Sequence, residues 1–236
     1  MIRKGMQGPL ARSSNSPPPP DFVYDPPTDP WLNVIHHDQE LVVLSKPAGL
    51  LSVPGRDPAH HDSLELRARE RFPEARIVHR LDRGTSGIFV MALTARAHRH
   101  LGLQFEKRQT RKTYVALVSG KIEKDKGTLD LAMRTDWYNR PKQMVDTCMG
   151  REAITQWEVL ERHDNHTRVL LSPLTGRSHQ LRVHMQYLGH PILGDSFYAP
   201  PSSVENSSRM MLHAESLEIA HPDGGQRVRF TDPCPF

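Results

Sequence analysis

Apolar and polar positions along the chain form patterns that predict more strands than helices. Residues 41–44 are a short apolar run bounded by polar residues, and residues 88–93 form a second such run, which is typical of buried strands. Other β-rich segments are residues 113–118, 154–160, 167–171, 209–214, 216–220 and 227–231. These segments favour an α+β fold with a large mixed or antiparallel sheet.

Three helices are predicted from apolar residues at helical spacing. The first begins after a capping residue at Asp62 or Ser63, and the second begins after Thr94. The third spans residues 178–188 and ends before Gly189, a residue type that commonly follows a helix. Helices and strands together predict one folded unit over residues 31–236.

The first thirty residues have a different composition. Serines lead into the run Pro17 to Pro20, and three more prolines follow before residue 31. Because proline fixes φ and lacks a backbone donor, neither a helix nor a sheet ladder can pass through this segment. We therefore expect residues 1–30 to be a proline-rich tail without regular structure.

Composition narrows the class of protein. The chain has 236 residues with a mean hydropathy of −0.57, and no stretch approaches 18 apolar residues, so no membrane span is expected. The N-terminus lacks the continuous apolar core of a signal peptide. Cys148 and Cys234 are the only cysteines, which fits a reducing, cytoplasmic compartment better than a disulfide framework.

Positive charge is concentrated in one part of the chain. The net charge is +4, but residues 76–112 contain nine cations and two acids, a local balance of 9 − 2 = +7. A local excess of this kind favours a polyanionic partner such as nucleic acid. A solvated basic helix face is the alternative interpretation.

The segment from His79 to Gly87, HRLDRGTSG, carries the candidate chemistry. Asp82 lies between Arg80 and Arg83 in a glycine-containing turn that leads into a predicted strand. Nearby positive charge favours the ionised carboxylate, and a loop mounted on a strand can present it to a substrate. A structural ion pair in a tight turn is the alternative.

This segment resembles the signature of the RluA-type pseudouridine synthases. Four more segments resemble motifs of the same family and follow in the family's order: SKPAGLLSVPG (45–55), RKTYVALVSG (111–120), LTGRSHQLRVHMQYLGHPILGDSFY (174–198) and MLHAESLEI (211–219). Together the matches extend from about residue 31 to about residue 230. A single nine-residue match would be suggestive, whereas five ordered matches are highly specific.

The resemblance implies the pseudouridine synthase fold, a long, mixed and mostly antiparallel sheet flanked by helices and loops. The active site is then expected in a basic cleft across this sheet. The implied reaction is isomerisation of uridine in structured RNA to pseudouridine, with RNA as the partner and with no metal or organic cofactor.

Three residues match the catalytic positions of the family. Asp82 matches the catalytic aspartate, Arg182 the arginine that pairs with it, and Tyr114 the active-site tyrosine. A carboxylate can attack the sugar or the base, or it can take a proton on a route through a glycal, and the sequence does not choose between these.

Five further residues are predicted to contact the substrate. We expect Arg80 to fill the space that a flipped-out base leaves, and Leu212 to form an apolar wall of the uracil pocket. Lys46 and Arg83 are candidate phosphate contacts. For Arg177, phosphate binding and bracing of the loop before the third helix both remain open.

The resemblance also bears on the substrate. Residues 50–58 and 136–145 are similar to a compact member of the family that modifies both an anticodon stem-loop of tRNA and a stem-loop of 23S rRNA. The same dual specificity is expected here, for a monomer. A synthase that acts on one tRNA or rRNA site is the alternative.

Two competing functions come from other classes. Fourteen histidines invite a metal-dependent phosphohydrolase, but no histidine or cysteine spacing typical of zinc occurs. A non-catalytic RNA-binding module would also explain the basic segment. Mutation of Asp82 separates the two RNA hypotheses, because an enzyme would lose turnover and keep its RNA affinity.

Overall fold

The computed structural model describes residues 23–236, so most of the predicted tail, residues 1–22, lies outside the described residues. Residues 23–30 contain neither a helix nor a strand. They nevertheless contact the body of the protein, because the Tyr24 hydroxyl donates to the Asp62 carbonyl at 2.7 Å and accepts from the Leu51 amide at 2.9 Å. The Pro27 carbonyl accepts from the Arg67 guanidinium at 2.8 Å.

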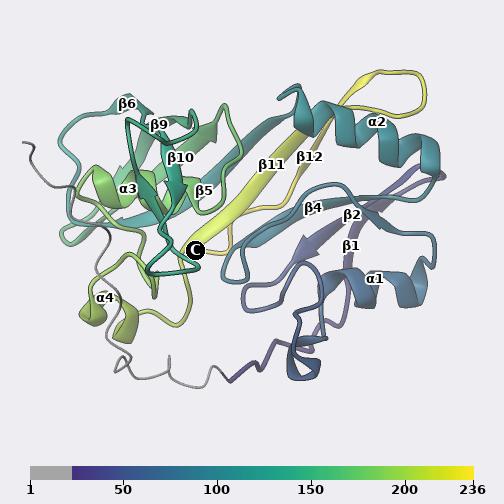
Figure 1. The fold of residues 1–236 in the computed structure, drawn as a ribbon, viewed down its shortest axis with the longest axis horizontal. Coiled ribbons are helices and arrows are strands. Elements are labelled where there is room, and N and C mark those ends of the chain that lie inside the picture. The colour runs from purple at the N-terminus through teal and green to yellow at the C-terminus, as the bar shows by residue number, and fades with distance from the viewer. Residues whose placement is uncertain (1–22) are drawn as a thin grey trace, which may run out of the picture.

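Within residues 23–236, ten strands form one long sheet that crosses the whole molecule (Figure 1). The path is β1-β2-β4-β11-β5-β10-β9-β6, with β3 paired to β4 and β12 paired to β11. These strands are β1 (Asn33–His37), β2 (Leu41–Lys46), β3 (Arg76–Ile77), β4 (Ser86–Ala92), β5 (Arg111–Ser119), β6 (Lys126–Asp130), β9 (Ile154–Arg162), β10 (His166–Pro173), β11 (Leu212–Ala220) and β12 (Arg227–Thr231). A separate hairpin joins β7 (Met133–Thr135) to β8 (Gln143–Val145).

The two halves of the sheet meet at a short parallel pair. β4 and β11 pair only at Ser86 with His213 and at Gly87 with Ala214, whereas the other strand pairs are antiparallel. Gly87 has φ +111, and a Cβ there would lie 2.2 Å from the Ala214 carbonyl oxygen. Only glycine allows the two strands to approach this closely. We call this pair the seam.

Helices cover both faces of the first half of the sheet. α1 (Leu64–Arg71) packs on Val42 and Leu44 of β2, whereas α2 (Ala95–Glu106) packs on Leu41 and Val43. Successive side chains of a strand point to opposite faces, so the two helices lie on opposite sides of β2 and β4, as Figure 1 shows. The continuous apolar run at residues 41–44 is therefore explained by burial on both faces.

Capping residues fix where the two helices begin. The Ser63 hydroxyl accepts from the Leu66 amide at the start of α1, and the Thr94 hydroxyl accepts from the Ala97 amide at the start of α2.

α3 (Gln180–Tyr187) packs against the second half of the sheet, with Leu181 and Met185 buried. Two short elements complete the chain, η1 (Pro58–His60) and α4 (Pro201–Glu205).

The α+β class and the mostly antiparallel sheet are confirmed. The two strands predicted for residues 209–214 and 216–220 are a single strand over residues 212–220, and β1 and β6 were not predicted. No helix among residues 23–236 is long and apolar enough to span a membrane.

Candidate active site

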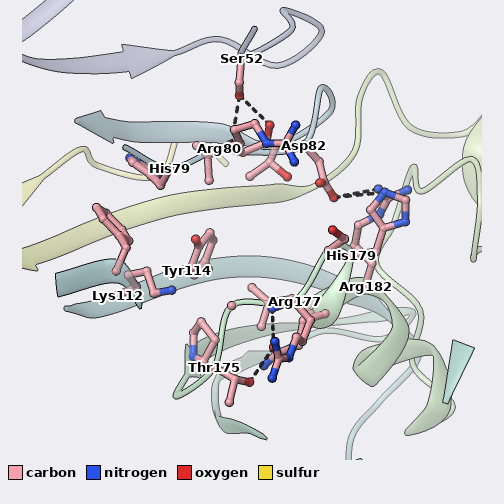
Figure 2. Close-up of a pocket in the computed structure, with 18 of the residues that line it drawn as sticks. Ser52, His79, Arg80, Asp82, Lys112, Tyr114, Thr175, Arg177, His179 and Arg182 are labelled. Carbon is pink, nitrogen blue, oxygen red and sulfur yellow. Dashed lines mark hydrogen bonds and ion pairs between the residues drawn. The ribbon is translucent and has the colours of Figure 1, made fainter. Parts of the chain in front are cut away.

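A cavity of about 900 Å³ opens across the seam. Its wall combines the loop before β4, the start of β5 and the segment that leads into α3 (Figure 2). The lining includes Arg80, Asp82, Lys112, Tyr114, Arg177, His179, Arg182 and Leu212. The whole lining contains five arginine or lysine side chains (Arg80, Arg108, Lys112, Arg177, Arg182) and two acids (Asp82, Glu106), so the cavity favours an anionic occupant.

Asp82 is held by the turn that precedes β4. The Thr85 amide donates to the Asp82 carbonyl at 3.1 Å and closes the turn. Ser52 fixes the preceding residue from the opposite loop, since its hydroxyl donates to the Leu81 carbonyl at 2.7 Å and accepts from the Leu81 amide at 3.1 Å. The Asp82 side chain remains 29% exposed, so it can reach the cavity.

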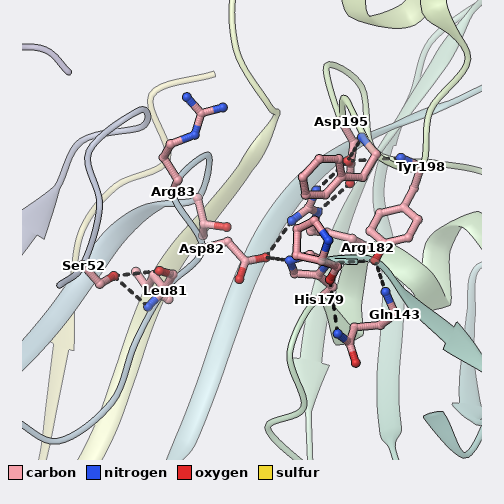
Figure 3. A network of polar contacts seen from close by, with 12 residues as sticks. Ser52, Leu81, Asp82, Arg83, Gln143, His179, Arg182, Asp195 and Tyr198 are labelled. Carbon is pink, nitrogen blue, oxygen red and sulfur yellow. Dashed lines mark hydrogen bonds and ion pairs between the residues drawn. The ribbon is translucent and has the colours of Figure 1, made fainter. Parts of the chain in front are cut away.

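Arg182 lies between two carboxylates. Its Nη1 donates to Asp82 Oδ2 at 2.9 Å, while Nε and Nη2 donate to the two oxygens of Asp195 at 2.7 Å each (Figure 3). Burial opposes the charge of Arg182, but the hydrogen bonds and the charges of Asp195 and Asp82 outweigh burial and raise its pKa. The predicted contact between Asp82 and Arg182 is therefore present, and the guanidinium is fixed by a second, fully buried acid.

Sequence reasoning missed Asp195, His179 and Tyr198, although all three lie in the segment 174–198 that carried the resemblance. His179 Nε2 lies 3.8 Å from Asp82 Oδ2, and His179 Nδ1 lies 2.7 Å from the Tyr198 hydroxyl. His179 precedes α3 with φ 54 in the left-handed region. An aspartate and a histidine inside the quoted motif were the signal that could have found them.

Tyr114 and Leu212 lie in the cavity wall on neighbouring strands, β5 and β11. Burial, and then the charge of Asp82, raise the pKa of Tyr114 above its usual value, so its hydroxyl is protonated at neutral pH. Leu212 is 3% exposed and contributes apolar surface. Met211, the residue before it in the chain, is not among the residues that line the cavity.

The predicted cationic contacts differ in their positions. Arg80 is exposed and lines the cavity. Arg177 also lines it, and its Nε donates to the Glu152 carbonyl at 3.0 Å, which braces the loop before α3. Arg83 is not part of the lining, and its side chain points away from the Asp82 carboxylate in Figure 3.

The expectation that Lys46 contacts phosphate is corrected. Its side chain is fully buried, and its ammonium group donates to the carbonyls of Pro47, Arg83 and Thr85 at 3.0, 3.1 and 2.8 Å. Burial lowers the pKa of Lys46 to about 7. Lys46 therefore stabilises the turn around Asp82 through hydrogen bonds to backbone carbonyls, and it is not among the residues that line the cavity.

His79 is used as a structural acceptor. Its Nε2 accepts from the Val90 amide at 3.0 Å, and its ring stacks between Phe89 and Phe105 at centroid distances of 4.5 and 4.6 Å. Burial, and then the charge of Lys112, lower the pKa of His79 to about 3. Among residues 23–236, no three His, Cys, Asp or Glu side chains gather in a way that could hold a metal ion.

Comparison with known proteins shows which family this sequence resembles. Residues 40–187 match the model of the RNA pseudouridylate synthase family. The chain is 50% identical over 214 residues to the dual-specificity RNA pseudouridine synthase RluA of Escherichia coli strain K12, covering 90% of this chain and 98% of the relative. The corresponding protein of Pasteurella multocida is 49% identical over the same length, with the same coverage.

A solved structure agrees with the sequence comparison. Human RNA pseudouridylate synthase domain containing 1 superposes with a TM-score of 0.75 at 32% identity, covering 92% of this chain and 87% of the human chain. The family match is consistent with the order of the five sequence motifs and with the cavity across the seam. The chain belongs to the RNA pseudouridylate synthase family.

Proposed function

We propose that this protein converts specific uridines in structured RNA to pseudouridine, with Asp82 as the catalytic carboxylate. The observation that carries the proposal is the ion pair between Asp82 and Arg182, 2.9 Å long, inside a cationic cavity of about 900 Å³. Such a cavity is large enough for a nucleotide that has left its stack, and it supplies an acid where the nucleotide would arrive.

The reaction makes definite demands on the site. The bond from N1 to the sugar breaks, the uracil turns, and a bond from C5 to the sugar forms while C5 loses a proton and N1 gains one. Asp82 serves as the nucleophile toward the sugar or the base, or as the base on a glycal route. Arg182 orients Asp82 with planar guanidinium geometry.

Other residues of the cavity act on the base and its surroundings. Tyr114 stacks on the detached uracil, and its protonated hydroxyl assists the late loss of the C5 proton by hydrogen bonding and not as the base that takes it. Leu212 forms the apolar wall of the same pocket. Arg80, exposed at the rim, enters the space that the flipped base leaves, while Arg177 and Arg83 contribute phosphate contacts.

The names of the relatives extend the proposal to the substrate. Several relatives of about 50% identity are called dual-specificity RNA pseudouridine synthases. We assign to this chain an anticodon stem-loop of tRNA and a stem-loop of 23S rRNA, with a single tRNA or rRNA site as the alternative. A cytoplasmic location belongs to the same proposal, because two free cysteines suit a reducing compartment.

Tritium release from RNA labelled at C5 of uridine tests the activity directly, because the reaction removes that hydrogen. Asp82→Asn should reduce release by at least about 10³-fold while RNA affinity changes by less than about threefold. Asp164→Asn, at an exposed position, is the matched control and should behave as wild type. Unchanged release in Asp82→Asn would contradict the assignment.

Mapping of pseudouridine in cells that lack the protein tests the substrates. Loss of modification in both a tRNA anticodon loop and 23S rRNA is expected. Loss at one site alone would support the single-site alternative.

A further inference from the structure

The second contact of the Asp82 carboxylate has no role in the function proposed above. His179 Nε2 faces Asp82 Oδ2 at 3.8 Å, next to the Arg182 nitrogen that donates to the same oxygen at 2.9 Å. The His179 side chain is only 12% exposed. Figure 3 shows the imidazole between Asp82 and Tyr198, at the end of a chain of polar contacts that starts at Gln143.

The hydrogen-bond chain determines which nitrogen of His179 carries the proton. The backbone amide of Gln143 donates to the Tyr198 hydroxyl oxygen at 2.8 Å. The single proton of that hydroxyl then needs an acceptor, and His179 Nδ1 at 2.7 Å is the one that the described residues provide. Since a buried donor is costly to leave unpaired, the hydroxyl donates to Nδ1.

Both partners are neutral at physiological pH. Burial raises the pKa of Tyr198 to about 12, so the phenol keeps its proton. Burial lowers the pKa of His179 and outweighs the opposing charge of Asp82. A neutral imidazole that accepts at Nδ1 carries its proton at Nε2, the nitrogen that faces Asp82.

We propose that Tyr198 and His179 form a positioning relay for Asp82, in which the Tyr198 hydroxyl fixes the His179 tautomer and Nε2–H, 3.8 Å from Oδ2, orients that oxygen through a contact longer than a direct hydrogen bond. The proposal rests on the function assigned above. Arg182 and His179 both contact Oδ2. The other oxygen, Oδ1, has no hydrogen-bond partner among the described residues, and we assign it as the oxygen that meets the substrate. The relay also joins the β7–β8 hairpin, through the Gln143 backbone, to the carboxylate.

The relay explains why a residue in the left-handed region precedes α3. A non-glycine residue at φ 54 is uncommon, and the conformation is strained. Held in this way, the ring is aimed at Asp82 and Tyr198 at once. A histidine that merely filled space would need neither partner.

A double-mutant cycle in kcat tests the relay. Tyr198→Phe should lower kcat by about tenfold and change KM for RNA by less than about twofold, because it removes the tautomer control and leaves the binding surface intact. His179→Gln retains an amide donor in place of Nε2–H and should therefore be more active than His179→Ala. In the His179→Gln background, Tyr198→Phe should have little further effect. Additive losses, or losses confined to KM, would overturn the proposal.

Tyr187→Phe is the matched control, because Tyr187 lies on α3 with 61% of its surface exposed and contributes no hydrogen bond to the relay. It should leave kcat and KM unchanged. A fall in kcat comparable with that of Tyr198→Phe would contradict a specific relay.

A readout independent of activity separates the relay from the proposed function. Nitrogen-15 spectra of the imidazoles, with His179→Gln to assign the signal, should show Nδ1 unprotonated in the wild type. In Tyr198→Phe this preference should be lost. Protonation at Nδ1 in the wild type would overturn the relay, whereas the expected tautomer in a protein without tritium release would overturn the proposed function alone.

Discussion

At the scale of single residues, the site depends on one guanidinium that serves two acids. Arg182 is 5% exposed and divides its donors between Asp82 and the fully buried Asp195. Asp195 also accepts from the backbone amide of Phe197 at 3.0 Å, which ties the loop after α3 to the same carboxylate. A residue outside the cavity therefore sets the position of a residue inside it.

Asp195→Asn should impair the protein in two ways. Because one partner of a buried ion pair loses its charge, we expect the free energy of unfolding to fall by about 3 kcal/mol or more. Turnover should fall by about 10²-fold because Arg182 is displaced. Chemical denaturation and tritium release measure the two effects.

Asp125→Asn is the control for Asp195→Asn, since it removes the ion pair with Arg162 at a carboxylate that is 86% exposed. It should change the free energy of unfolding by less than about 1 kcal/mol. Full activity in Asp195→Asn would show that Arg182 does not depend on the buried acid.

The pKa of His79 predicts acid sensitivity. Unfolded His79 takes up a proton near pH 6.5, whereas folded His79 does so near pH 3. The free energy of unfolding should therefore fall as the pH drops from 6.5 towards 3, by up to about 1.4 kcal/mol per pH unit from this group. His79→Gln should flatten the profile between pH 6 and 4, and His163→Gln, at an exposed site, should not.

Proton NMR of the His79 ring provides the direct check. Its resonances should stay unchanged between pH 8 and pH 5. A titration midpoint near 6.5 would contradict the assignment of His79 as a neutral, buried acceptor.

At the scale of elements, the seam between β4 and β11 decides how the two halves of the sheet meet. Only two residue pairs join these strands. Beyond them, β4 pairs with β3 and β11 pairs with β12. Asp82 precedes β4 on one side, whereas Tyr114 and Arg182 belong to the other side. The geometry of the seam therefore controls the geometry of the site.

A pair of glycine substitutions tests this dependence. Gly87→Ala should lower the free energy of unfolding by at least about 2 kcal/mol, because the φ of +111 is strained for alanine and its Cβ would meet the Ala214 backbone. Gly102→Ala, in the middle of α2 with nothing within 4 Å, should raise it by about 0.5–1 kcal/mol. Thermal unfolding measures both, and equal stability of the two variants would contradict the role of the seam.

Sequence patterns predicted elements whose signals are local. The apolar runs at β2 and β4, and the capping residues Ser63 and Thr94, were sufficient for the strands and helices that they mark. β1 and β6 were missed because their residues are mostly exposed and carry little hydrophobic periodicity. The separation of residues 209–214 and 216–220 into two strands was wrong, because the chain passes through a register shift between Ala214 and Ser216 as one continuous strand.

The candidate site was predicted only where its residues carry a local sequence signal. The motifs placed Asp82, Arg182 and Tyr114, because each stands in a recognisable segment. The second acid on Arg182 and the burial of Lys46 depend on side-chain directions and on contacts with distant loops, which spacing along a chain does not specify. A cationic side chain near a reactive acid can equally be a backbone support.

At the scale of the whole molecule, the cavity collects cations from segments far apart in the sequence. Arg80 lies before β4, Lys112 is on β5 and Arg177 precedes α3. Burial lowers the pKa of Lys112, which is one of the residues that line the cavity (Figure 2). The described residues offer Lys112 no ion-pair partner, so a phosphate is its natural counterion.

RNA binding should therefore depend steeply on salt. The logarithm of the association constant should fall linearly with the logarithm of salt concentration, and Lys112→Met should reduce the slope by about 0.7–0.9. Lys124→Met removes the same charge at an exposed position in the loop after β5 and should leave the slope unchanged. Equal slopes for wild type and Lys112→Met would contradict a phosphate contact.

The contact between Asp82 and Arg182 joins residues one hundred positions apart. A ribosome that adds roughly 5–20 residues per second delivers the arginine about 5–20 s after the aspartate. During that interval the nascent chain displays its acid without the guanidinium that aims it. The carboxylate therefore lacks its guanidinium until residue 182 has been added, and β11, which pairs with β5 and brings Leu212 to the cavity, is synthesised later still.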